Sequence, residues 1–439
     1  MNQLVTIFSL VFLLNTSFLF AQKNHKVVAG PMISFIDSYG TQMWFLLDSD
    51  AEKININVRD YDDEKSSKYE FDVVNKYKTD YVPYTIVLEN LLPNKEYIAS
   101  VFVDSVFVKE IDIFTKRPHL DDIQFLIGSD CTYLLRNNGY KDIFSNMEKT
   151  NSDFMVWLGN HVDILPSSSV KLDLLWKSLG LSESEIRQLK LYSTPSDIYM
   201  YNMIKAYVDI RENSDLNRFL SSAPQIATWG NLDFCDPNVT WGMKDTTHMV
   251  FESFWPNSLQ KTYNYTYYDY GTYQRYTYND LDLFLLDAMT FKSDSTLYGD
   301  RQIERMFQEI QNTGATFTII ASPTPFTFDS EDTFLNYKEE FDYFLYKLDM
   351  SDLDGVVLLS NSSVNKTFMQ QYDLSNASVL DESCSNCIYE FRLPSIASGH
   401  YSLVNITGKN KKRTLLIETY DEFGSLVFKK ELKEVDLKR

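Results

Sequence analysis

The segment Asp153-Phe-Met-Val-Trp-Leu-Gly-Asn160 contains five consecutive apolar residues that end in Gly-Asn. A short apolar run bounded by turn residues is typical of a buried strand. Similar runs recur after residue 120, and helical stretches separate them, which predicts an α/β domain. The strand candidates are Ile123–Ile127, Phe154–Leu158, Leu283–Leu286, Phe317–Ile320 and Gly355–Leu359, and the helical candidates are Ile186–Leu191, Ile198–Glu212 and Asp300–Gln311.

The loops after these strands are where we expect functional side chains. Ligands of α/β sheets bind just beyond the carboxyl ends of the strands. The loops in question are residues 128–131, 159–163, 287–289 and 360–363.

Residues 22–117 have a different pattern and predict a small β domain. The segment Leu91-Leu-Pro-Asn-Lys-Glu-Tyr97 combines a Leu-x-Pro turn with a Tyr on the following strand, and it resembles fibronectin type III β-sandwiches. Such domains usually position or bind. The strand-like runs are Gln42–Leu47, Ile54–Val58, Tyr84–Leu88 and Ile98–Val103.

Arg117-Pro118 marks the expected linker, so the α/β domain is predicted to span residues 118–439. The Tyr-rich run Tyr263–Tyr278 predicts a hairpin near Gly271 with exposed aromatic rings, or alternatively an aromatic binding platform. The end of the chain, Arg413–Lys430, predicts a C-terminal β-hairpin.

The N-terminus predicts export. Leu4–Phe20 is largely apolar and is followed by Ala21-Gln22, which is typical of a signal peptide covering residues 1–21. The alternative is an N-terminal membrane anchor. We expect a periplasmic, cell-surface or secreted protein.

Charge and cysteines narrow the function further. The formal net charge of −20 argues against nucleic-acid binding, which needs a basic surface. It also disfavours docking to anionic lipid. Cys384 and Cys387 form a Cys-x-x-Cys pair, for which an oxidising compartment favours a local disulfide.

Six segments between about residues 120 and 407 resemble, in order and spacing, the motifs of the PhoD-like metallophosphatases. That family has a strand ending in Gly-Asp, a Trp-Asp-Asp-His-Asp segment, a Leu-Asp-x-Arg strand and a Leu-Gly-x-x-Gln helix start. The resemblance implies a four-layer α/β/β/α sandwich preceded by the β-sandwich. The segments are Asp153–Asn160, Pro224–Asp233, Phe284–Asp287, Gly299–Gln302, Ala315–Ile320 and Val356–Ser360.

The chemistry of the family depends on its metal ligands. Metal ions neutralise the charge of a phosphoester and lower the pKa of a bound water towards ~7. Carboxylates, imidazoles and thiolates at fixed positions hold these ions.

Several of these positions carry neutral residues here. The aspartate of Gly-Asp is Asn160, and Gly230-Asn-Leu-Asp233 replaces Asp-Asp-His-Asp, with Leu232 at the His position. The Arg after Leu-Asp is Met289. An amide oxygen carries no charge and cannot replace a metal-bridging carboxylate.

Two further loops depart from the pattern. Ser360-Asn-Ser-Ser-Val-Asn365 replaces Ser-Gly-Asp-Arg-His-His. The early Gly-Ser-Cys is Gly128-Ser-Asp-Cys131, so Asp130 occupies the Cys position or Cys131 is displaced by one residue.

The polar residues that remain could still line one cleft. A single Ca²⁺ on Asp163, Asp233 and Asp236 is one hypothesis, and helix caps or turns are the alternative role for these acids. The residues expected at the former cleft are Asp130, Cys131, Asn160, His161, Asn231, Leu232, Asp233, Asp287, Met289 and Asn361.

These losses indicate a pseudoenzyme that binds an unidentified protein or glycan as a binding or scaffold subunit, without a cofactor. The alternative is a phosphomonoesterase or phosphodiesterase with rearranged ligands, which would use Ca or Fe. Membership of a cell-surface or outer-membrane assembly is a third hypothesis.

Overall fold

The structure is a computed structural model of the 439-residue chain. The predicted signal segment and the predicted helix Ile186–Leu191 lie outside the residues that it describes. Those are residues 26–36, 38–62, 65–75, 80–115, 122–130, 132, 142–164, 182, 184, 195–234, 241–257, 271–311, 313–361, 364–374, 378–380 and 386–438.

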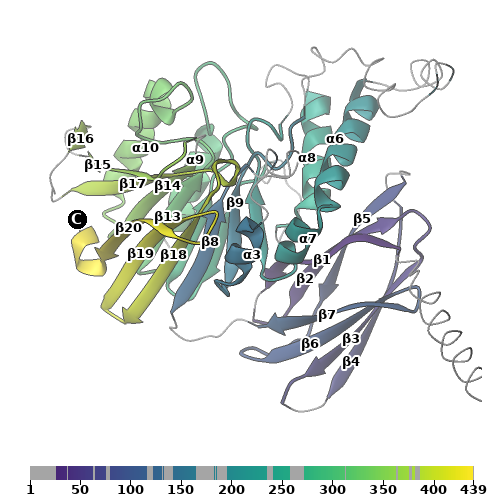
Figure 1. The fold of residues 1–439 in the computed structure, drawn as a ribbon. Helices are drawn as coiled ribbons and strands as arrows, with labels where there is room; N and C mark the ends of the chain where they lie inside the picture. Colours follow the sequence, from purple (N-terminus) through teal and green to yellow (C-terminus); the bar gives the residue numbers. More distant parts are fainter. Residues whose placement is uncertain are drawn as a thin grey trace, which may run out of the picture.

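The N-terminal part is a sandwich of two antiparallel sheets (Figure 1). Alternate residues of each strand point into a shared apolar core, as Ile54, Ile56 and Val58 do. This strand order is compatible with the predicted fibronectin type III-like domain. One sheet has the order β1 (Val27–Ile36), β2 (Thr41–Asp48), β5 (Tyr81–Leu88), and the other β4 (Ser66–Asp72), β3 (Lys53–Asp60), β6 (Glu96–Val103), β7 (Val106–Phe114).

Two larger sheets follow. Strands β8, β9 and β10 are parallel, as are β12, β13, β14 and β17. The first sheet has the order β10 (Gln225–Thr228), β9 (Phe154–Leu158), β8 (Ile123–Gly128), β18 (His400–Lys409), β19 (Lys412–Asp421), β20 (Leu426–Lys433). The second has the order β11 (Gln274–Tyr278), β12 (Leu281–Leu285), β13 (Phe317–Ser322), β14 (Val356–Asn361), β17 (Cys387–Leu393), β15 (Phe368–Asp373), β16 (Ser378–Leu380).

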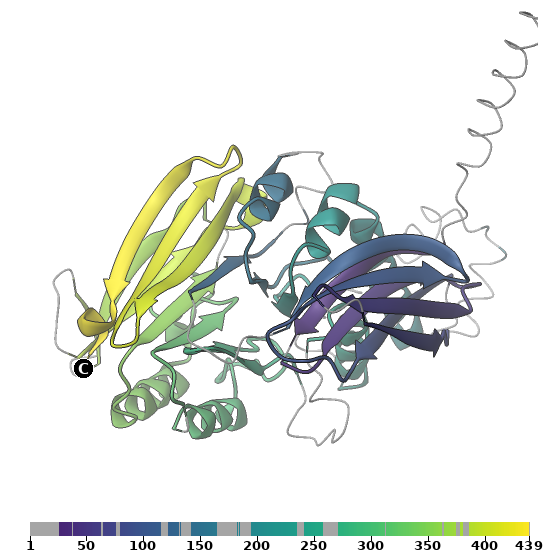
Figure 2. The ribbon, with the colours of Figure 1, turned by 90° about the horizontal axis from the view of Figure 1, so that it is seen from below.

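The sheets pack face to face, and helices cover their outer faces. In β9, Phe154 and Val156 face the other sheet, whereas Met155 and Trp157 face the helices. Burial on both faces explains why this strand is apolar throughout. The layers are therefore α/β/β/α, as the resemblance to the PhoD-like metallophosphatases implied (Figure 2). Helices α3 (Ile143–Glu148), α6 (Pro195–Arg211), α7 (Ser214–Leu220) and α8 (Trp241–Phe254) cover the first sheet, and α9 (Asp300–Ile310) and α10 (Lys338–Met350) the second; three short 3₁₀ turns are η3 (Phe334–Asn336), η4 (Ile396–Ser398) and η5 (Glu434–Leu437).

The Tyr-rich run differs from its prediction in the half that the structure describes. The hairpin is β11–β12 and turns at Asn279, not at Gly271. Tyr273 and Tyr276 are buried instead of exposed. They fill the space where this edge of the second sheet meets α9 and β9.

No helix in the described ranges is long and apolar enough to cross a membrane.

Candidate functional site

Three loops meet at the carboxyl ends of β8, β9 and β10. The backbone N–H of Asp130 donates to the carbonyl of Gly159 (3.1 Å), and the N–H of Leu232 donates to Oδ1 of Asn160 (3.2 Å). Gly159 and Gly230 allow this contact, because a Cβ on Gly159 would lie 2.4 Å from the nitrogen of Gly230. The fold thus brings Asp130, Asn160 and Leu232 together at one edge of the sheet.

Asp233 is fully buried under these loops and holds two of them together. The backbone N–H groups of His161 and Val162 donate to Oδ1 (2.6 and 2.9 Å). Those of Asn160 and Gly230 donate to Oδ2 (2.6 and 2.8 Å). Burial raises the pKa of Asp233 and these four N–H groups lower it, and the two effects together place it at about 7. Each carboxylate oxygen accepts two hydrogen bonds from the protein, which occupies its two lone pairs.

Asp287, at the end of β12, is saturated in the same way. Its Oδ1 accepts hydrogen bonds from the indole N–H of Trp229 and from the backbone N–H groups of Met289 and Thr290, at 2.8–2.9 Å. Its Oδ2 accepts from the backbone N–H of Thr272 (2.7 Å) and the hydroxyl of Thr290 (2.6 Å). This carboxylate fixes the loop after β12.

Asp130 and Asp163, on the loops after β8 and β9, are half-buried. Burial raises the pKa of Asp130, the hydroxyl and backbone of Thr132 lower it, and the negative charge of Asp163 raises it further. The hydroxyl of Thr132 donates to Oδ1 of Asp130 (3.0 Å). Asp130 also has a positive φ of 52°, which its short polar side chain tolerates.

The ring of His161 lies in the aromatic core. Its Nε2 donates to the carbonyl of Thr228 (2.9 Å), which leaves Nδ1 as the acceptor nitrogen, and this atom has no hydrogen-bond partner among the residues that the structure describes. The ring centroid is 4.5 Å from that of Trp255. Burial lowers the pKa of His161 to about 3. The imidazole is therefore neutral near pH 7.

Sequence reasoning missed Glu390, a fully buried carboxyl group on β17 that organises the end of β14. It accepts hydrogen bonds from the backbone N–H groups of Phe326 (2.9 Å) and Thr327 (2.6 Å) and from the hydroxyl of Ser360. Burial raises the pKa of Glu390. A charged residue inside the apolar strand Cys387–Leu393 was the available signal.

The remaining predicted residues occupy varied environments. Asn231 is exposed, Met289 is buried in the core under the helices, and the amide of Asn361 donates to the carbonyl of Pro394 (3.3 Å). Cys387 is disulfide-bonded. Cys131, Asp236 and Cys384 lie outside the described residues.

The described residues do not fit a pair of catalytic metal ions. Such ions need carboxylate or imidazole lone pairs directed into one cavity. The lone pairs of Asp233 and Asp287 accept hydrogen bonds from the protein itself, and Nε2 of His161 is a donor. Within the described ranges, no three His, Cys, Asp or Glu side chains are placed to share an ion.

A small β-sandwich followed by two packed sheets with outer helices is the architecture of the metallophosphatase class of fold. A solved structure of PhoD is similar to this chain, with a TM-score of 0.67 and 13% identity over 94% of this chain and 93% of PhoD. The purple acid phosphatase PPD1 from yellow lupin (Lupinus luteus) seeds is also similar, with a TM-score of 0.60 and 10% identity over 92% of this chain and 74% of PPD1. The chain thus has the PhoD-like metallophosphatase fold. No protein-family model and no curated protein matches the sequence.

Proposed function

We propose that this chain is an exported, non-catalytic protein that uses a metallophosphatase fold to bind a protein or glycan partner. The main support is the commitment of Asp233 and Asp287 to backbone and side-chain donors of their own loops. A carboxylate that stabilises loops in this way contributes no charge to a metal-filled cleft. The neutral residues Asn160 and Leu232 support the same conclusion.

Export is proposed from the sequence of the first 21 residues and is compatible with the disulfide at Cys387, because disulfides persist in oxidising compartments.

Metal analysis and turnover test the proposed loss of catalysis. We expect fewer than two tightly bound ions per purified chain and no hydrolysis of a chromogenic phosphoester with Ca²⁺, Fe³⁺, Zn²⁺ or Mn²⁺. Metal-dependent turnover that Asp130→Asn abolishes would contradict the proposal, since that variant separates the protein's own activity from a contaminant.

A paired variant sharpens this test. Asn160→Asp with Leu232→His restores two family positions. If the chain were an active enzyme with rearranged ligands, activity should change greatly on this substitution. We expect no hydrolytic activity in the wild-type chain or in the paired variant, because Asp233 remains bound to four backbone N–H groups in both.

A further inference from the structure

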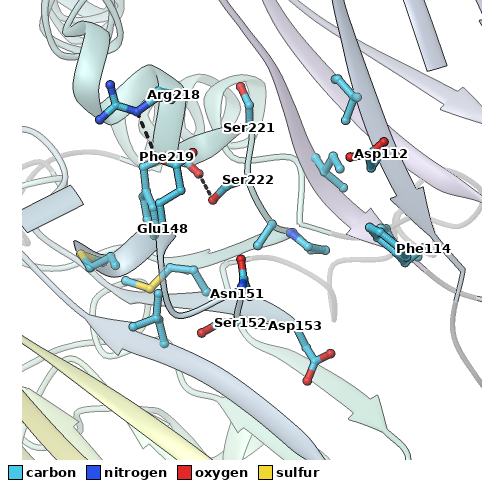
Figure 3. Close-up of a pocket in the computed structure, with 18 of the residues that line it drawn as sticks. Asp112, Phe114, Glu148, Asn151, Ser152, Asp153, Arg218, Phe219, Ser221 and Ser222 are labelled. Carbon is cyan, nitrogen blue, oxygen red and sulfur yellow. Dashed lines mark hydrogen bonds and ion pairs between the residues drawn. The ribbon is translucent and has the colours of Figure 1, made fainter. Parts of the chain in front are cut away.

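A cavity of about 620 Å³ lies between the N-terminal sandwich and the α/β domain. Strand β7 forms one wall, and the loops before β9 and β10, residues 151–153 and 221–224, form the opposite wall (Figure 3). These loops lie at the amino ends of the parallel strands. The former catalytic edge lies at their carboxyl ends, so the two sites are separate.

The backbone edge of β7 is open along this cavity. Among the described strands, β7 pairs with β6 alone. The N–H of Thr115 donates to the carbonyl of Lys95 (3.0 Å). This bond shows which residues of β7 point their backbone groups to β6 and which point them away, because the two directions alternate along a strand. Residues 111 and 113 therefore direct their backbone groups to β6, and residues 110, 112 and 114 direct theirs outward. Such a row of N–H and C=O groups can pair with another strand.

The side chains of β7 specify what kind of strand would fit. Glu110, Asp112 and Phe114 lie on the exposed face, two residues apart, and Ile111 and Ile113 lie in the core. An added strand would place alternate side chains beside the two acids and the aromatic ring. Its other face would continue the apolar layer.

The charges around the cavity favour a basic partner. Its lining contains more acidic than basic side chains. The acids are Glu110, Asp112, Glu148 and Asp153, and the bases are Lys109 and Arg218. Arg218 is already paired with Glu148 (3.0 Å). The chain also has a net charge of −20, which attracts basic segments over a longer range.

We propose that β7 is a docking edge for an extended segment of a partner protein in which Lys or Arg alternates with aliphatic residues. The segment adds as a fifth strand beside β7 and runs through the interdomain cavity. This inference rests on the proposed binding role but not on the loss of catalysis. The metal and turnover assays test the latter, and a peptide titration tests the docking edge.

The probe is a fluorescent octapeptide in which Lys and Val alternate, titrated into the full chain. We expect saturable binding, and slower hydrogen exchange of the amides of residues 110, 112 and 114 when the peptide is bound. The double charge reversal Glu110→Lys and Asp112→Lys should raise the dissociation constant of the peptide at least tenfold. Asp72→Lys, on the opposite edge strand β4, is the matched control and should leave it unchanged.

A peptide of the same sequence that is N-methylated at every backbone amide keeps the charge but cannot donate backbone hydrogen bonds, and it should not bind. Equal binding of the N-methylated peptide would show unspecific attraction and overturn the proposal. So would the absence of binding, or protection of these amides in the free protein by a second copy of the chain.

Discussion

At the scale of single residues, the Asp233 carboxylate joins the loop after β9 to the loop after β10. It accepts four backbone N–H groups at 2.6–2.9 Å inside the protein. A buried N–H group without an acceptor costs about 1–3 kcal/mol. The side chain is therefore structural, whatever its ancestry.

Replacing Asp233 by Asn keeps the shape but turns one acceptor oxygen into a donor NH₂ group. Two backbone N–H groups lose their acceptor, so we expect Asp233→Asn to lower the free energy of unfolding by about 2–5 kcal/mol. Urea unfolding at pH 8 measures this. Asp352→Asn, at an exposed turn with a positive φ of 47°, should change it little. Equal stability of the two variants would contradict the role of Asp233.

His161 makes stability depend on pH in a defined direction. Its pKa is about 3 in the folded protein against an ordinary value of 6.5, because the ring is buried. Between these values the unfolded chain binds more protons, so acid favours unfolding. This contribution is complete above pH 6.5 and is lost as the pH falls towards 3.

His161→Gln removes the titration but keeps a donor for the carbonyl of Thr228. The stability difference between wild type and variant should shrink on acidification, by at most about 1.4 kcal/mol per pH unit. The raised pKa of Asp233 changes stability with pH in the opposite direction, but it does so equally in wild type and variant, so its effect cancels in the difference. Unfolding free energies from pH 7 to pH 4 measure the difference, and a constant difference would mean that the ring is solvated.

At the scale of elements, the side chain of Asn257 covers the edge of the first sheet at Ala227. Asn257 accepts from the N–H of Ala227 (2.8 Å) and donates to its carbonyl (2.7 Å), as a neighbouring strand would. It thereby protects β10, an edge strand with four buried residues.

Asn257→Ala leaves the N–H of Ala227 without this acceptor, whereas the carbonyl keeps a hydrogen bond from the side-chain amide of Gln274 (3.2 Å). We expect a loss of about 1–3 kcal/mol in the free energy of unfolding and faster hydrogen exchange of the Ala227 amide. Met350→Ala, at an exposed position on α10, serves as control. Unchanged exchange at Ala227 would show that another group covers this edge.

At the scale of the whole molecule, the N-terminal sandwich shares its core with the α/β domain. The indole N–H of Trp44 donates to the carbonyl of Ser253 (2.6 Å). The guanidinium of buried Arg211 lies 4.9 Å from the ring centroid of Trp44 and 4.1 Å from that of Trp255. Figures 1 and 2 show the sandwich beside α6, α7 and α8, away from the C-terminal hairpin.

Because this core is shared, the two parts should unfold in one calorimetric transition. Trp44→Ala should destabilise that transition by about 3–5 kcal/mol, as expected for a large buried aromatic residue. Leu92→Ala, exposed on the same domain, should have little effect. Two separate transitions in the wild-type protein would contradict a shared core.

The sequence by itself determined the alternation of apolar strands and helices that marks the α/β domain, but not every element of it: helices α3, α7, α8 and α10 and strands β15 to β18 were not predicted. Apolar runs such as Phe154–Leu158 and the helical spacing of Asp300–Ile310 are local patterns that burial imposes directly. It also indicated that functional side chains lie in the loops after the parallel strands, because parallel strands end at one edge of a sheet. The losses at Asn160 and Leu232 were likewise visible without coordinates.

Only the tertiary structure decided what the surviving acids do. Asp233 takes its donors from residues 160–162 as well as 230, Glu390 takes its donors from residues 326, 327 and 360, and the ring of His161 turns into an aromatic core. The open edge of β7 also depends on which domain lies beside it. Hydrogen-bond partners and burial are set by residues far apart in the chain, so no local pattern of residues encodes them.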